Sequence, residues 1–480
     1  MRARRPVAAM PPPRSQTMPA SSHRLNALAA ATALALLGAA CARLRRPGPP
    51  RRPRRRRQPP VHRQVPRRQR AVAREVAAMK AALDAAAAAG APKLSALRAM
   101  ALPGMRVVTT PGPLKRAQAT ALMRQLAADP NVEFVQVDGG VTVKMTPNDP
   151  QFSRQWHYAD TAAGIRAPTA WNATAGAGVV VAVVDSGILS HTDLNANVLP
   201  GYDFVSAVNG RNAAECAIDG LSAGCGKSLD GDGRDANPHD AGNIPHGNHV
   251  AGTIAAVTNN GLGVAGIAHA AKIVPVRAAG SQGYNAHSDT IDAIVWASGG
   301  HVAGVPDNLN PAEVINVSLG SDIACTPAWQ AGVDAAAANG ALVVVAAGNG
   351  NNDVSGNVPA GCNNVVAVAA TDKNGAKSSF SAWGAKIDLA APGGDGLFNQ
   401  VQSTVANNGY GAMSGTSMAS PHVAGVAALV RSLAPGKTPA QVEALLKSTA
   451  RPIPASKCSR GCGAGLVDAA AAVAAAQSSR

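Results

Sequence analysis

Aromatic side chains are scarce in this 480-residue chain, where phenylalanine, tryptophan and tyrosine together make up only 3%. Glycine, in contrast, occurs 49 times. A chain of this length can form one large domain together with smaller parts. The small number of aromatic residues and the many small ones favour closely packed α/β layers over a β-sandwich.

Acidic residues are absent from the first part of the chain. Residues 1–74 contain 19 of the 44 lysines and arginines and none of the 28 aspartates and glutamates, whereas residues 146–480 contain 17 basic and 23 acidic residues. The formal charge of +16 therefore belongs to the N-terminal part and gives no reason to expect nucleic-acid binding. The run RRPRRRR at 51–57 has the proline-interleaved composition of a disordered tract, which we favour over an anion-binding site.

The apolar run LNALAAATALALLGAACA at residues 25–42 is too short and too weakly flanked for a stop-transfer helix. Because it ends in small residues, we interpret 1–42 as a signal peptide region and expect a secreted, extracellular protein without a membrane anchor. A start at Met18 would give a cleaner signal, and a misassigned or frameshifted N-terminus is an alternative. Acylation of Cys41 is less favoured, since Gly38 stands where lipoprotein signals usually have a larger aliphatic residue.

Cysteine is also rare, with seven residues of which one lies in the predicted signal region. The remaining six form an even number, which indicates disulfides in an exported chain. We favour pairing between sequence neighbours, which gives Cys216 with Cys225, Cys325 with Cys362, and Cys458 with Cys462. Zinc binding is the alternative, but no CxxC pair with suitably spaced histidines supports it.

The composition divides the chain after the signal region into three parts. Residues 43–102 are rich first in arginine and proline and then in alanine, so we expect partial disorder followed by a helix within 75–102. Residues 103–145 form a small α+β pattern, with a strand at 105–110, a helix at 115–128 and two strands within 132–143. Residues 146–480 form the large domain.

The large domain alternates valine-rich runs with helical patterns. The expected strands are nearly continuous in apolar residues, as in parallel strands that are covered on both faces; they lie at 178–185, 272–278, 313–319, 341–347 and 364–370. The expected helices lie between or after them, at 246–257, 288–299, 327–338, 417–433 and 439–449. This alternation predicts an α/β fold with a mostly parallel central sheet.

Four polar residues stand at the ends of these elements, where open parallel sheets form their sites. Asp185 could orient an imidazole, His246 could act as a general base, and Ser417 could be a nucleophile at a helix start. Asn349 could donate a hydrogen bond to an oxyanion. Each has an ordinary structural explanation when taken alone, and His249 competes with His246, which its place at the helix mouth favours.

Together these residues carry a family resemblance. The chain resembles the subtilases, or subtilisin-like serine peptidases, in the segments VAVVDSGI (181–188), HGNHVAGT (246–253), VINVSLG (314–320), VVVAAGN (343–349) and GTSMASPHVAG (415–425). The resemblance implies a three-layer αβα domain, an Asp185–His246–Ser417 triad and an oxyanion hole formed with Asn349. It also implies that 103–145 is an inhibitory propeptide, removed by self-cleavage near Lys144–Thr146.

The resemblance further implies where a peptide substrate would bind. The expected contacts form two edges and a pocket wall: Ser318, Leu319, Gly320, Gly283, Tyr284, Ala346, Ala347 and Gly348. No charged residue falls in these segments, so we expect apolar side chains to be tolerated before the cut bond. Two departures are Asn248, where the family usually has threonine, and the segment 278–287.

Calcium is the expected cofactor, as a structural ion. The loop DGDGRDANPHD at 230–240 brings closely spaced oxygen donors together without forming an EF-hand: Asp230, Asp232, Asp235 and Asp240. A solvated acidic turn is the alternative. By resemblance, a second site involves Asp149 and Asn259.

These observations predict a secreted serine endopeptidase that is self-processed from a proenzyme. Its expected partners are protein and peptide substrates and its own propeptide, with no nucleic acid and no membrane, and we expect a monomer. A catalytically impaired, peptide-binding pseudoprotease is one alternative. A specialised processing peptidase or peptide ligase is another.

Overall fold

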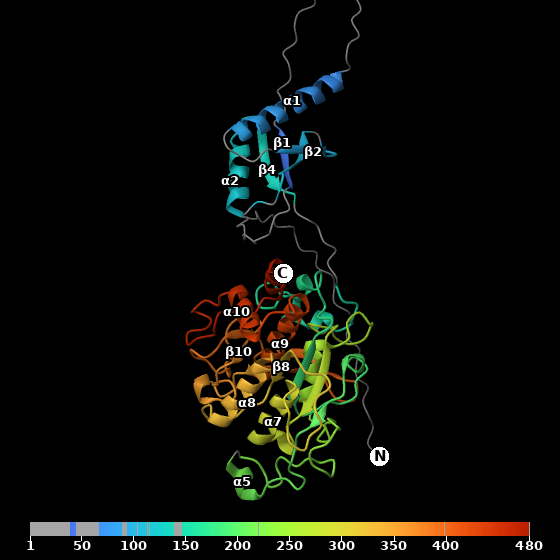
Figure 1. Cartoon of the computed structure of the whole chain (residues 1–480), viewed down its shortest axis with the longest axis vertical. Coiled ribbons are helices and arrows are strands. Elements are labelled where there is room, and N and C mark those ends of the chain that lie inside the picture. The colour runs from blue at the N-terminus through green and yellow to red at the C-terminus, as the bar shows by residue number, and fades with distance from the viewer. Residues whose placement is uncertain are drawn as a thin grey trace, which may run out of the picture. The chain divides into compact units, whose positions relative to one another are not determined.

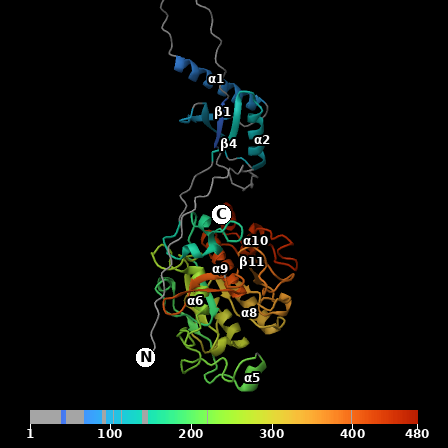
Figure 2. The same ribbon diagram turned by 180° about the vertical axis from the view of Figure 1, so that it is seen from behind.

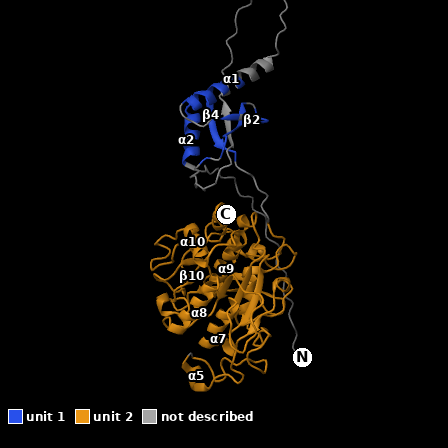
Figure 3. Cartoon of the chain, viewed as in Figure 1, with its two compact units in different colours: residues 1–141 blue, residues 142–480 orange. Residues whose placement is uncertain are grey.

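The computed structural model describes residues 39–44, 67–88, 94–138 without 103, 113 and 115, and 146–479 without 219 and 398. The chain divides into two compact units, residues 1–141 and 142–480 (Figure 3). Most of the predicted signal region and Arg-rich tract lies outside the described residues. So do the second strand expected within 132–143 and Lys144, next to the expected cleavage site.

The first unit is a four-stranded antiparallel sheet with two helices (Figure 1). The strand order is β2-β3-β1-β4, and the elements are β1 (Ala39–Leu44), α1 (Arg67–Ala88), β2 (Ser95–Ala99), β3 (Met105–Thr109), α2 (Arg116–Ala127) and β4 (Val132–Val137). Small apolar side chains join the helices to the sheet, since Ala82 of α1 packs with Val108 and Val132. The strand and helix expected at 105–110 and 115–128 are therefore present.

The structure of this unit differs from two of the expectations. Strand β1 lies between β3 and β4 and pairs with both, so it crosses the boundary expected between residues 42 and 43. Residues 95–99, expected within a helix, form β2 and pair with β3. In both cases pairing with another strand decides the conformation, which the composition of the segment itself does not reveal.

The second unit contains a seven-stranded sheet in which every pair of neighbours is parallel. Its order is β11-β10-β9-β8-β5-β7-β6, formed by β5 (Val180–Asp185), β6 (Tyr202–Asp203), β7 (Lys272–Arg277), β8 (Val314–Val317), β9 (Leu342–Ala346), β10 (Val365–Thr371) and β11 (Leu389–Pro392). All five strands expected from the valine-rich runs are present within a few residues of their predicted ends. The short edge strands β6 and β11 were not anticipated.

Helices cover both faces of this sheet (Figures 1 and 2). Alternate strand residues point to opposite faces, so Val181 and Val183 pack with α6 (His246–Ala255) and α9 (Thr416–Leu433). Ala182 and Val184 pack on the other side with α7 (His287–Ala297) and α8 (Pro327–Ala338). The expected three-layer αβα architecture is confirmed.

The remaining elements surround these layers. They are the short helices α3 (Trp156–Ala159), α4 (Ala167–Ala170) and α5 (Ala213–Ile218), the helices α10 (Pro439–Thr449) and α11 (Ala469–Ser478), and the hairpin of β12 (Val401–Thr404) and β13 (Tyr410–Met413).

The three predicted disulfides are all present, at 216–225, 325–362 and 458–462. Within the described residues, none of the helices combines the length and the apolar character that a membrane span requires.

Candidate active site

Asp185 ends β5 at the carboxyl edge of the sheet, between β7 and β8. Its side chain is fully buried, and its Oδ1 atom accepts a hydrogen bond from the Ser186 backbone N–H at 2.7 Å. The backbone carbonyl of Asp185 accepts from Ala278, which fixes the strand end against the segment after β7. The carboxylate is therefore held in one place with one oxygen directed at His246.

His246 is the first residue of α6, directly after Pro245. Its Nδ1 atom lies 2.7 Å from Asp185 Oδ1. Because a carboxylate only accepts, Nδ1 carries the proton in the neutral ring and Nε2 is left as an acceptor. Burial by itself lowers the pKa of His246, but the charge and hydrogen bond of Asp185 and the charge of Asp240 outweigh it and raise that pKa above its ordinary value.

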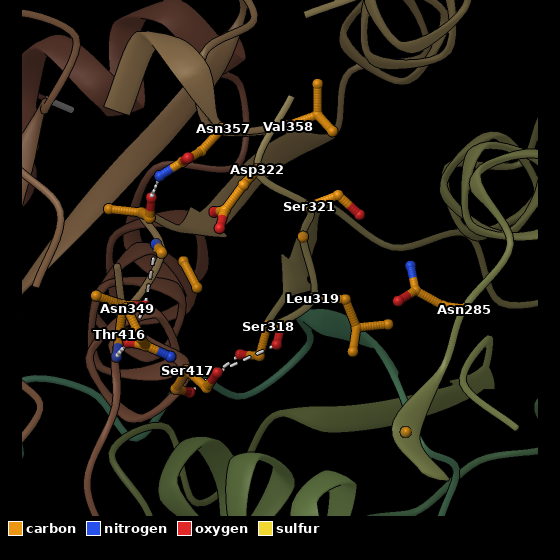
Figure 4. Close-up of a pocket in the computed structure, with 15 residues that line it drawn as sticks. Asn285, Ser318, Leu319, Ser321, Asp322, Asn349, Asn357, Val358, Thr416 and Ser417 are labelled. Atoms are coloured by element: carbon orange, nitrogen blue, oxygen red, sulfur yellow. Dashed lines mark hydrogen bonds between the residues drawn. The ribbon is translucent and has the colours of Figure 1, made fainter. Parts of the chain in front are cut away.

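Ser417 is the second residue of α9, and Gly415 precedes the helix. Its hydroxyl donates to the Ser318 carbonyl at 3.2 Å, while the Ser318 hydroxyl donates to the Ser417 carbonyl at 3.0 Å (Figure 4). No hydrogen bond joins Ser417 to His246 among the described residues. Since α6 and α9 pack against each other, the two helix starts are nevertheless held on the same side of the sheet.

Asn349 follows β9, and Thr416 fixes the orientation of its side-chain amide. Both the backbone N–H and the hydroxyl of Thr416 donate to Asn349 Oδ1 at 2.9 Å. Because a backbone N–H can only donate, the amide oxygen must face Thr416, and the Nδ2 donor points elsewhere. Thr416 is completely buried and also accepts from the Gly348 N–H at 3.1 Å. The sequence did not indicate this role, although Thr416 lies next to Ser417.

A pocket of about 250 Å³ opens beside Ser417 (Figure 4). Seven of the eight residues expected to contact substrate line it, together with Asn349 and Ser417; the seven are Ser318, Leu319, Gly320, Gly283, Ala346, Ala347 and Gly348. Tyr284 is not among the lining residues, because its ring packs on Gly226 and lies 5.3 Å from the Arg211 guanidinium. The sequence did not indicate the six further lining residues, which are Asn285, Ser321, Asp322, Asn357, Val358 and Thr416.

The two residues that raised questions near His246 have structural partners. His249 is buried and donates from Nε2 to the Val401 carbonyl at 2.9 Å, and burial lowers its pKa to about 3. Asn248 forms two hydrogen bonds with the backbone of Leu189, at 2.6 and 2.9 Å. Asn248 therefore ties α6 to the loop after β5, and neither side chain takes the place of His246.

The acidic loop at 230–240 is arranged largely around an arginine. The Arg277 guanidinium, which is 1% exposed, pairs with Asp203 and Asp230 at 2.5 Å. Asp240 accepts from the Ser186 hydroxyl at 3.2 Å. Partial desolvation and the charges of Asp235 and Asp230 raise the pKa of Asp232, so these carboxylates repel one another.

The second expected metal site is organised by backbone contacts. Asp149 accepts from the backbone N–H groups of Asn259 and Asn260 at 3.0 and 3.3 Å. Asn259 in turn accepts from the backbone N–H of Asn148 at 3.1 Å. In the part of the chain that the structure describes, no three histidine, cysteine, aspartate or glutamate side chains lie close enough together to hold a metal ion.

Comparison with known proteins provides the context for this geometry. The sequence pattern of the subtilase family matches residues 176–465, which include Asp185, His246, Asn349 and Ser417. The chain belongs to the subtilase family. This subtilase is 37% identical over 306 residues to a thermitase of Thermoactinomyces vulgaris. The match covers 64% of the subtilase and 91% of the thermitase.

Two relatives are more similar in sequence but longer. An extracellular protease of Xanthomonas campestris is 52% identical over 392 residues, and an extracellular basic protease of Dichelobacter nodosus is 45% identical over 385 residues. These matches cover 80% and 74% of the subtilase, but only 66% and 60% of the relatives. A solved protease structure from Pseudoalteromonas arctica is 47% identical, with a TM-score of 0.63, and the match covers 69% of the subtilase and all of that chain.

Proposed function

We propose that this subtilase is a secreted serine endopeptidase in which Asp185, His246 and Ser417 act together. The observation that carries the proposal is the 2.7 Å hydrogen bond from His246 Nδ1 to buried Asp185, which leaves Nε2 as a base. The names of two relatives, an extracellular protease and an extracellular basic protease, support secretion.

The mechanism begins with a rotation of the Ser417 hydroxyl. Its proton is directed at the Ser318 carbonyl, so it must turn toward His246 Nε2 before it can be abstracted. Catalytic hydrogen bonds are often long or misaligned without substrate, and a bound peptide would occupy the backbone groups of the 318–320 segment. Substrate binding thereby frees the nucleophile.

Acyl transfer then follows in two halves. Ser417 Oγ attacks the peptide carbonyl while His246 takes its proton, and the new oxyanion accepts hydrogen bonds from Asn349 Nδ2 and the Ser417 backbone N–H. His246 returns the proton to the leaving amine, and the C–N bond breaks to give an acyl-enzyme. Water attacks this ester with His246 as base, which releases the acid and restores Ser417.

Residues 103–145 supply the inhibitory propeptide in this proposal, and the peptidase domain cuts near Lys144–Thr146. A structural Ca²⁺ ion is also proposed. The carboxylates of Asp232 and Asp235 would hold it in the 230–240 loop, because their mutual repulsion favours a cation. Asp230 fits this role less well, since Arg277 already neutralises it.

Labelling with a fluorophosphonate probe tests the proposed function. We expect an adduct on Ser417, mapped by mass spectrometry, that is lost in His246→Ala and reduced by several orders of magnitude in Asp185→Asn. The same preparation carrying Ser417→Ala should remain full-length when no other protease is present. An unlabelled Ser417 in correctly folded, calcium-loaded protein would instead favour the pseudoprotease.

A further inference from the structure

The pocket beside Ser417 contains one charged side chain, that of Asp322. Fifteen described residues line this pocket, and the other fourteen are glycine, alanine, valine, leucine, serine, threonine or asparagine. In Figure 4 the Asp322 carboxylate points toward the side of the pocket that carries Asn349 and Thr416, and away from Asn285. The carboxylate thus faces the space that a substrate side chain would occupy.

The backbone that carries Asp322 is fixed on both sides. The preceding residue, Ser321, exchanges two backbone hydrogen bonds with Val358, at 3.0 and 2.9 Å. Three residues after Asp322, the disulfide between Cys325 and Cys362 joins the same two segments again. Asp322 therefore lies in a short loop closed at both ends, which keeps its carboxylate at the pocket.

No other described residue neutralises this carboxylate. Asp322 is exposed and has no hydrogen bond or ion pair within the described part of the chain. Other acidic residues differ, since Asp289 pairs with Arg234 and Asp353 accepts from Ser355. An unpaired carboxylate in a concave site attracts cationic groups and repels anionic ones.

We propose that Asp322 makes this subtilase prefer lysine or arginine at the residue immediately before the cut bond. The proposal rests on the proposed endopeptidase function. The aliphatic stem of such a side chain would lie along Leu319 and Ala347, and its charged end would reach Asp322. The expected tolerance of apolar side chains considered only residues 283–284, 318–320 and 346–348, whereas Asp322 lies two residues beyond Gly320.

The expected size of the preference for lysine depends on how exposed the ion pair between Asp322 and the substrate side chain would be. An exposed ion pair contributes less than a buried one, so we expect lysine to be favoured over glutamine by about three- to fivefold in kcat/KM. Glutamine is the appropriate comparison because it is polar and unbranched but neutral. Glutamate should be cleaved more slowly than glutamine, and salt should weaken both effects.

The test uses peptides that differ only at the residue before the cut bond. The kcat/KM ratio of lysine to glutamine should fall to about one in Asp322→Asn, and Asp322→Lys should reverse the order of lysine and glutamate. Asp307→Asn is the matched control, because Asp307 is also exposed but pairs with His301 outside the pocket. A lysine preference that is unchanged in Asp322→Asn would overturn the proposal.

Peptide binding to inactive variants tests the role of Asp322 independently of the proposed endopeptidase function. Affinities of the same peptides for Ser417→Ala, and for Ser417→Ala combined with Asp322→Asn, report on the pocket without catalysis. Fluorophosphonate labelling of Ser417 together with equal lysine and glutamine affinities would overturn the role of Asp322 and keep the endopeptidase. Lysine-selective binding that requires Asp322, without labelling, would support the role of Asp322 and overturn the endopeptidase.

Discussion

Thr416 is the residue that orients the side-chain amide of Asn349, the proposed oxyanion donor. Its hydroxyl connects Asn349 Oδ1 to the Gly348 N–H, so one side chain positions both parts of the loop after β9. Thr416→Val keeps the shape of the side chain but removes both hydrogen bonds, each contributing about 1 kcal/mol. We expect kcat to fall about tenfold while KM changes little, measured with a peptide substrate.

Thr416→Ser provides the matched control for this positioning role. Serine keeps the hydroxyl and should restore most of kcat, whereas a role in packing alone would require the methyl group. Melting temperatures of both variants separate the two effects. A Thr416→Val enzyme that is less stable but has normal kcat would show that Asn349 is oriented without this hydroxyl.

Three buried histidines connect the elements around α9. His422 donates from Nδ1 to the Met418 carbonyl at 2.7 Å, so its Nε2 accepts from His157 Nδ1, also at 2.7 Å. Burial lowers the pKa of His422 to about 4 and that of His249 to about 3, and burial together with the charge of His422 lowers the pKa of His157. Protonating His422 would place two N–H groups face to face.

This arrangement predicts acid sensitivity with a definite sign. In the unfolded chain these histidines have an ordinary pKa near 6.5, so on acidification the unfolded state takes up protons before the folded state does. Their stabilising contribution is complete above about pH 6.5 and is lost as the pH falls toward about 4. Each neutral histidine should add about 1.4 kcal/mol per pH unit to the slope of the unfolding free energy.

Denaturant unfolding of Ser417→Ala, which prevents self-digestion, measures this slope between pH 4.5 and 7.5. His249→Gln keeps a donor for the Val401 carbonyl but cannot titrate. It should therefore lower the slope of the unfolding free energy by about 1.4 kcal/mol per pH unit, which is the contribution of one proton. His301→Gln is the control, because His301 is 74% exposed. Equal slopes in all three proteins would show that the buried histidines do not control acid stability.

At the scale of the whole molecule, the proposed calcium ion should affect global stability. A ligand that binds only the folded state and is present at about 100 times its Kd contributes about 2.7 kcal/mol. We expect excess chelator to lower the melting temperature of Ser417→Ala by about 4 °C. Asp232→Asn combined with Asp235→Asn should reduce this shift, whereas Asp307→Asn should not. An identical melting temperature with chelator and with calcium would exclude the proposed site.

The sequence predicted most of the large domain because its signals are local. The valine-rich runs and helical patterns indicated five of the seven strands, and the three disulfides follow sequence order. The short strands β6 and β11 carry too few residues to show a pattern. In the first unit, β1 and β2 were missed because pairing with β3 determines them.

The sequence by itself determined which residues could perform the chemistry. Asp185, His246, Asn349 and Ser417 each stand at the end of a recognisable element, and a parallel sheet brings such ends to one edge. Tertiary structure alone decided how these groups are oriented and what surrounds them. Thr416 turns the amide of Asn349, Ser318 holds the hydroxyl of Ser417, and the pairing of Ser321 with Val358 brings Asp322 to the pocket. These relations depend on contacts between segments far apart in the chain, which no local pattern encodes.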